Sequence, residues 1–69
     1  HNRTDIIEAK IVRILKSEKE MNSDSLFAEV KNKLNNIFTV ERELYDTCIN
    51  KLNEKEYLYL DSSKIKYIP

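Results

Sequence analysis

The chain has 69 residues, in which twelve basic side chains balance twelve acidic ones and leave no formal net charge. A chain of this length forms one small domain, and we expect a single domain over residues 1–69. The balanced charge argues against nucleic acid or an anionic membrane as a partner, because both attract basic patches. No apolar run approaches the roughly 20 residues that span a bilayer. The single cysteine, Cys48, excludes an internal disulfide and favours a reducing, intracellular compartment.

The first predicted element is an amphipathic helix over about residues 4–19. Its apolar side chains recur at the i, i+4, i+7 and i+8 positions: Ile7, Ile11, Ile14 and Leu15. Thr4 or Asp5 is expected to cap its start. Lys16 lies five positions after Ile11, which rotates it by roughly 140° around the helix. We therefore expect Ile11 to face the core and Lys16 to face solvent.

A second helix is predicted over about residues 23–35, after one residue of sheet pairing at Met21. Residues 22–25 read Asn-Ser-Asp-Ser and are rich in helix-capping types. The apolar positions that follow have helical spacing: Leu26, Phe27, Val30 and Leu34. Asn35-Asn36 is expected to end the helix in a left-handed conformation, which Asn tolerates better than most residues.

A third helix is expected to begin at Thr39 as the cap and to run to about residue 54. One continuous stripe along it is apolar: Val40, Leu44, Tyr45, Cys48, Ile49 and Leu52. Cys48 is interpreted as a small buried side chain in this stripe. We expect this helix to close a core with the first two.

The C-terminal part is predicted to be an antiparallel hairpin, with strands at 57–60 and 65–68 and a turn at 61–64. The order helix, short strand, helix, helix, hairpin indicates an α+β fold, a small winged helix made of a three-helix bundle with a C-terminal β-hairpin wing. A bare three-helix bundle with a terminal hairpin would give nearly the same pattern. Either fold is expected to be a monomer as an isolated domain.

Three sequence blocks resemble the C-terminal domain of cullins, the scaffold subunits of multisubunit ubiquitin ligases. "IEAKIVRILK" (residues 7–16) is similar to the cullin motif "IEAAIVRIMK", and "CINKLNEKEYL" (48–58) is similar to "CIDILIEKEYL". "LFAEVKNKL" (26–34) fits between them in register. The chain departs from the family at Leu15, where Met is usual, and at Asp46-Thr47, where lysines are common. Its wing is also shorter than usual. The resemblance implies a divergent cullin winged-helix domain from the C-terminus of a larger scaffold.

The resemblance also implies a role for Lys16, which matches the family's acceptor of a ubiquitin-like modifier in an isopeptide bond (neddylation). Arg13, Lys10 and Lys19 would then contact the modifier or its conjugating enzyme. The implied partners are a RING-finger subunit, the modifier and that conjugating enzyme, in the cytoplasm and nucleus, within the ubiquitin pathway that serves the cell cycle. A cullin-like scaffold domain that is not modified but binds a conjugating enzyme is the alternative.

The sequence favours neither an enzyme nor a reader of DNA. With one histidine (His1), one cysteine (Cys48) and no glycine, the chain offers no catalytic triad, metal cluster or phosphate-binding loop. We therefore expect no catalytic residue, metal or cofactor. The third helix would read DNA in many winged helices, yet here acidic residues outnumber basic ones on it. The tyrosines could form a stacking platform but are interpreted as packing residues of the core and wing: Tyr45, Tyr57, Tyr59 and Tyr67.

Overall fold

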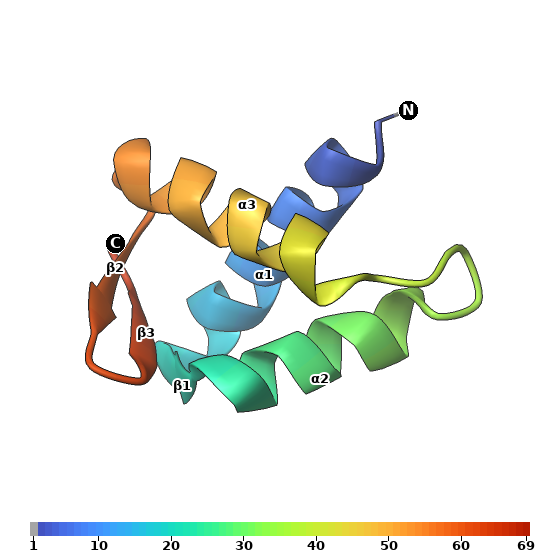
Figure 1. Cartoon of the computed structure of the whole chain (residues 1–69). Helices are drawn as coiled ribbons and strands as arrows, with labels where there is room; N and C mark the ends of the chain where they lie inside the picture. Colours follow the sequence, from blue (N-terminus) through green and yellow to red (C-terminus); the bar gives the residue numbers. More distant parts are fainter. Residues whose placement is uncertain (1) are drawn as a thin grey trace.

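Three helices and a small sheet make up the computed structural model, which describes residues 2–69 (Figure 1). His1, which the sequence does not favour as a catalytic group, lies outside the described residues. The elements are α1 (Arg3–Glu18), β1 (Glu20–Asn22), α2 (Ser23–Leu34), α3 (Arg42–Glu54), β2 (Leu58–Asp61) and β3 (Lys64–Tyr67). α1 contacts both α2 and α3, and the sheet lies at one end of the helices in Figure 1.

The sheet has three antiparallel strands in the order β1-β3-β2, so the predicted wing gains a strand from the segment between α1 and α2. Met21 on β1 stands opposite Ile65 on β3, as the expected pairing at Met21 requires. A sheet of this kind at the end of a three-helix bundle is the winged-helix arrangement predicted from the sequence. The bare bundle with a separate hairpin is excluded, because β1 ties the hairpin to the link between α1 and α2.

The core is drawn from every helix and from two strands. Its buried residues are Ile7, Ile11, Ile14, Leu15, Leu26, Val30, Leu34, Val40, Tyr45, Cys48, Ile49, Leu52, Leu58 and Ile65. The apolar stripes expected on the three helices account for most of this set. Leu44 and Phe27 lie at its margin and are half-buried. Burial of these side chains supplies the main driving force for folding a domain this small.

Two of the predicted helix starts are wrong. Asn2 caps α1, accepting a hydrogen bond from the Thr4 amide at 2.8 Å, so neither Thr4 nor Asp5 is the cap. Asn is among the best capping residues, and its position just before Arg3 was a usable signal. α3 begins at Arg42 rather than after Thr39, and its N-cap Glu41 makes no side-chain capping bond. The cap of α2 falls within the stretch 22–25 that was predicted to be rich in capping residues, since Asn22 accepts from the Asp24 amide at 2.9 Å.

The helix ends also differ from the prediction. Asn35 ends α2 in a right-handed conformation, not a left-handed one. The amides of Ile37 and Phe38 both donate to the Leu34 carbonyl, and this turn lengthens the link to α3. Positive φ angles occur instead at Lys19 (73°), Glu56 (64°) and Ser62 (57°). Because the chain has no glycine, residues with a Cβ adopt the positive φ at these three reversals, which is sterically unfavourable for them.

The hairpin turn is tighter than predicted. Asp61 and Lys64 pair across the strands, so only Ser62 and Ser63 connect β2 to β3.

The tyrosines differ in their exposure to solvent: Tyr45 is fully buried, but Tyr57 is 51% exposed and Tyr59 is 46% exposed. These two tyrosines are therefore not part of the buried core, and their packing in the wing stays a prediction. Tyr59 is on the outer face of the sheet, and Tyr57 lies before β2 starts.

Candidate modification site

Lys16 lies on the last turn of α1 with its side chain exposed, as the helical spacing predicts. Ile11, about 140° away around the helix, is fully buried. The adjacent Ile14 and Leu15 are core residues, so this turn is held in place while the amine of Lys16 stays in solvent. The ammonium group also lies near the negative end of the helix dipole, which favours a positive charge there. The candidate site is therefore the exposed amine of Lys16 on a helical turn that its neighbours anchor in the core.

The three cations named with Lys16 are not gathered around it. Arg13 is exposed one turn before Lys16, so these two share a face of α1. Lys10 is half-buried and lines a different groove, between α1 and α2, together with Lys33. Lys19 follows the end of α1, and its Nζ lies 5.8 Å from the centre of the Tyr67 ring. The structure therefore brings Arg13 to Lys16 and separates Lys10 and Lys19 from it.

A shallow groove of about 580 Å³ runs beside Lys16, between α1 and the C-terminal end of α3. We call it the α1–α3 groove. Its lining residues are Asp5, Glu8, Ala9, Val12, Arg13, Lys16, Leu52, Lys55 and Tyr57. Lys55 Nζ lies 3.3 Å from Glu8 Oε1, and the Glu8 side chain is only 12% exposed. This ion pair joins the two helices across the groove and satisfies a carboxylate that is nearly buried.

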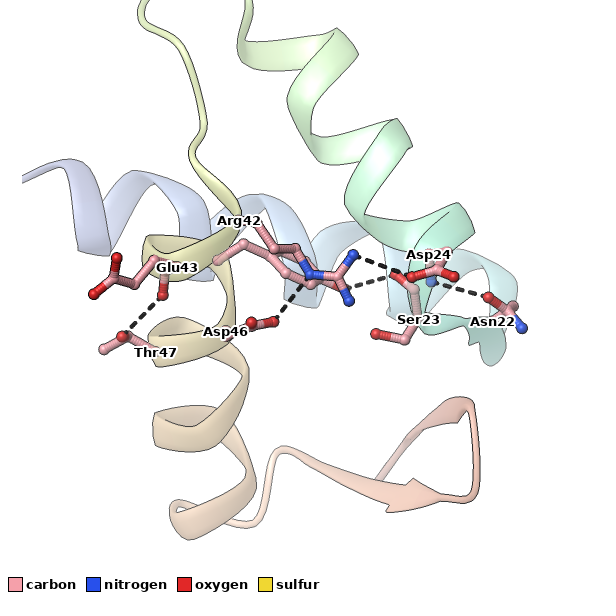
Figure 2. A network of polar contacts seen from close by, with 8 residues as sticks. Asn22, Ser23, Asp24, Arg42, Glu43, Asp46 and Thr47 are labelled. Atoms are coloured by element: carbon pink, nitrogen blue, oxygen red, sulfur yellow. Dashed lines mark hydrogen bonds and ion pairs between the residues drawn. The ribbon is translucent and has the colours of Figure 1, made fainter.

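Arg42, at the start of α3, is the centre of a second polar cluster (Figure 2). Its Nε lies 3.2 Å from Asp46 and its Nη1 lies 3.1 Å from Asp24, on α2. Hydrogen bonds to these two carboxylates raise the pKa of Arg42 above its ordinary value. The guanidinium also lies 5.0 Å from the ring centre of Phe27 and 5.5 Å from that of Tyr45. The cluster joins α2 to α3. It also holds Arg42 in ion pairs, on the helix that reads DNA in many winged helices.

The buried phenol and thiol have structural surroundings. Tyr45 donates its hydroxyl hydrogen bond to the Ser23 carbonyl at 3.1 Å, and burial raises its pKa to about 12. Cys48 Sγ lies 3.7 Å from the Thr4 carbonyl oxygen, and burial, aided by the charge of Glu8, raises the pKa of the thiol to about 11. A thiol with so high a pKa is almost wholly protonated near neutral pH, so it is a poor nucleophile.

Within residues 2–69, no group of three or more His, Cys, Asp or Glu side chains is arranged to hold a metal ion. No helix in that part of the chain is long and apolar enough to serve as a membrane span.

Comparison with known proteins places this geometry in a family. Residues 2–64 match the model of the cullin protein neddylation domain. The chain belongs to the cullin family. Cullin-1 of Caenorhabditis elegans is 39% identical over 57 residues, which make up 83% of this chain but 7% of that protein. This cullin domain therefore spans a small part of the length of the curated relative that it matches.

A solved structure gives the same answer for the fold. Its title is "A Dual E3 Mechanism for Rub1 Ligation to Cdc53: Dcn1(P)-Cdc53(WHB)". The cullin domain superposes on a chain of that structure with a TM-score of 0.93 at 25% identity, covering 97% of this chain and 80% of that one. The winged-helix fold expected from the sequence is thereby confirmed, as is the cullin resemblance that named the neddylation pathway.

The part of the site that sequence reasoning missed is the α1–α3 groove of this cullin domain. Val12 and Ala9 fall between the core stripe and the charged face of α1, so the helical pattern assigns them to neither. Tyr57 follows the positive φ of Glu56, outside the stripe of α3. Its exposure depends on a chain reversal at a residue that gives no such signal in the sequence. The sequence pattern places Tyr57 in the first strand of the hairpin, whereas β2 starts at Leu58, so nothing in the sequence singled this residue out.

Proposed function

We propose that this domain belongs to a cullin-type scaffold of a multisubunit ubiquitin ligase and that Lys16 accepts a ubiquitin-like modifier. The observation that carries the proposal is an exposed lysine on the last, well-anchored turn of α1, in a chain that matches a neddylation domain over residues 2–64. The domain has a scaffold role in this proposal. The transferring enzyme supplies the chemistry, and the domain supplies the amine.

An isopeptide acceptor must meet two conditions. Its amine must be reachable, which the exposure of Lys16 supports. It must also lose a proton before it attacks, since free lysine has a pKa near 10.4 and is protonated near neutral pH. A conjugating enzyme would meet the second condition at the moment of transfer. Arg13, one turn earlier on the same face, would offer acidic groups of that enzyme or of the modifier a second cation.

The proposed partners are the modifier, its conjugating enzyme and a RING-finger subunit. The similar solved structure names Rub1 ligation to Cdc53 and the protein Dcn1, which supports a partner from the neddylation machinery. Attachment to Lys16 would act as a switch: the covalent partner biases how the domain docks on the rest of the ligase, and so changes access to the bound substrate. The alternative is a scaffold domain that is not modified and binds a conjugating enzyme through Arg13 and the α1–α3 groove.

The test is reconstituted conjugation on the full-length scaffold with its RING subunit. Lys16→Arg keeps the charge and the long stem but removes the amine able to form the bond. We expect attachment at the main site to be abolished and ubiquitin transfer by the ligase to fall, with only traces on neighbouring lysines. Lys10→Arg and Lys19→Arg are the matched controls from the same helix region and should still be modified. Unchanged attachment to Lys16→Arg, with the product mapped elsewhere by mass spectrometry, would leave the unmodified scaffold as the better description.

A further inference from the structure

Ser17 lies in the last turn of α1, directly after Lys16, and its side chain is exposed. It lines a groove of about 360 Å³ between α1 and α2, which we call the α1–α2 groove. Ile14 and Met21 are the apolar residues of this groove, and its other lining side chains are charged. Lys16 itself lines the α1–α3 groove instead. The hydroxyl of Ser17 is therefore next to the candidate acceptor in sequence but in a different groove.

Three cations line the α1–α2 groove together with Ser17. Arg13 precedes Ser17 by four residues, so these two side chains are neighbours on one face of α1. Lys10 lies about two turns before Ser17 on the same helix. Lys33 reaches the groove from α2. An anionic group on Ser17 would thus lie among positive charges from two helices.

Two carboxylates, those of Glu18 and Glu29, also line the groove, so three positive charges face two negative ones. The ion pairs found among residues 2–69 involve none of these five side chains. The lysines of β3, by contrast, both pair with carboxylates. The cations of the groove are therefore able to turn toward an anion placed between them.

The sequence around Ser17 fits the substrate of an acid-directed protein kinase. Glu18 and Glu20 follow Ser17 at positions +1 and +3, and no other serine or threonine of the chain has an acid at both positions. A kinase with basic groups around its substrate selects such a charge pattern. α1 ends at Glu18, and the ends of helices open more readily than their interiors. Opening of this turn brings the hydroxyl within reach of the enzyme.

We propose that Ser17 is a phosphorylation site, that Arg13 and Lys33 hold its phosphate in the α1–α2 groove, and that the phosphate slows modifier attachment to Lys16. The last part rests on the proposed function. Phosphate oxygens accept charge-assisted hydrogen bonds from guanidinium and ammonium groups. The phosphate draws Arg13 away from the face that it shares with Lys16. Its negative charge also favours the charged form of the Lys16 amine, whereas the transfer needs the neutral form.

The phosphorylation step balances with a kinase and a nucleoside triphosphate as the other reactants. The Oγ atom of Ser17 attacks the γ-phosphorus, and an O–P bond forms. The bond between that phosphorus and the bridging β–γ oxygen breaks. The nucleoside diphosphate leaves with the electron pair, and a base of the kinase takes the hydroxyl proton.

The first test asks where phosphate is attached. The 69-residue chain is incubated with an acid-directed kinase (casein kinase II) and ATP, and the product is mapped by mass spectrometry. We expect phosphate on Ser17 and loss of most of the incorporation in Ser17→Ala. A product with phosphate on other hydroxyls and none on Ser17, or no product, would overturn the proposal.

The second test asks whether the groove holds the phosphate. Phosphorus NMR gives the second pKa of the phosphate on Ser17, which is about 6 for a free phosphoserine. We expect it about half a pH unit lower in the folded chain than in a phosphorylated peptide of residues 14–20, because nearby cations favour the dianion. Lys33→Gln should remove most of this difference. Lys31→Gln, an exposed lysine of α2 outside the groove, is the matched control and should keep it.

Two results of the NMR experiment would overturn the inference. One is a second pKa in the folded chain equal to or above that of the peptide. The other is an equal response to Lys33→Gln and Lys31→Gln, because a general loss of positive charge would then explain the shift.

The third test measures single-turnover transfer of the modifier to the full-length scaffold bound to its RING subunit. We expect the scaffold phosphorylated on Ser17 to react about threefold more slowly at Lys16 than the untreated one. Kinase-treated Ser17→Ala should keep the untreated rate. An unchanged rate on the phosphorylated scaffold would overturn the inference and leave Lys16 as the acceptor. A scaffold that is never modified on Lys16 would overturn the proposed function, while the first two tests would still decide on the phosphate site.

Discussion

Lysine side chains of this domain differ in what surrounds them, and this difference bears on which one can act as an acceptor. Lys55, Lys64 and Lys66 each lie within 3.3 Å of a carboxylate oxygen. The hydrogen bond to Asp61 raises the pKa of Lys66, which makes its amine harder to deprotonate. Lys16 instead is exposed and lines the α1–α3 groove. Its exposed position leaves the side chain open to a partner.

Two buried acids predict how stability depends on pH. Burial raises the pKa of Cys48 from 9.0 to about 11 and that of Tyr45 from 10.0 to about 12. Below about pH 9 both groups are protonated in the folded and unfolded chains, and their contribution is complete. Above it the unfolded chain releases protons that the folded chain keeps. We therefore expect the free energy of unfolding to fall by about 3–4 kcal/mol as the pH approaches 11.

Urea midpoints measured from about pH 7 to 11 check this expectation. Tyr45→Phe removes one of the two titrating groups and should flatten the upper part of the curve. It should also lower stability slightly at pH 7, because the hydrogen bond to the Ser23 carbonyl is lost. A midpoint that stays constant from pH 8 to 11 in the native sequence would contradict the burial of these groups.

At the scale of elements, α1 is the helix on which the others depend. It packs on α2 and α3, and it carries the site on the face that leaves the core. The polar connections between elements are mostly exposed, such as the pairs of Arg42 with Asp24 and Asp46, and exposed pairs contribute little. Apolar burial along the helix stripes must therefore supply most of the stability.

Truncation of the stripes should accordingly be costly. We expect Ile11→Ala or Leu52→Ala to destabilise the domain by about 2–5 kcal/mol, as loss of buried aliphatic groups does. Lys51→Ala, on the exposed side of α3, should change stability by less than about 0.5 kcal/mol. It is a cleaner control than Lys10→Ala, because Lys10 is half-buried. Denaturant midpoints that rank Lys51→Ala with the two core variants would be incompatible with this core.

For the whole molecule, charge separates this winged helix from those that bind DNA. Acidic and basic residues balance over the chain, and Arg42 on α3 is held by two carboxylates. On the outer face of the sheet, the lysines of β3 pair with Glu20 and Asp61 on the flanking strands. A duplex would therefore meet few cations able to release its condensed counterions.

A titration with duplex DNA at low and moderate salt tests this view. We expect no saturable binding at low ionic strength and no measurable salt slope, because phosphate neutralisation supplies most of the affinity of such proteins. A matched titration of Glu43→Lys with Asp46→Lys shows whether reversing the charge of α3 is enough to create binding. Micromolar binding of the native domain with a steep salt dependence would contradict the charge argument.

The sequence alone determined the elements and their core faces, because helical spacing of apolar residues reports directly on burial. The stripes of α1, α2 and α3 and the short strand at Met21 were predictable for that reason. The same periodicity placed Lys16 in solvent, and the motif around it identified the family. Capping was less certain, since Asn2, Thr4 and Asp5 are all competent residues within one turn and local propensity does not choose among them.

Tertiary structure decided which surfaces lie side by side. The α1–α3 groove brings together residues from position 5 to position 57, and no local sequence pattern predicts it. It exists because α1 and the end of α3 pack together and because Glu56 adopts a positive φ that leaves Tyr57 outside the core. The ion pair of Glu8 with Lys55 depends on the same packing. A groove is a property of two elements at once, whereas periodicity describes each element only by itself.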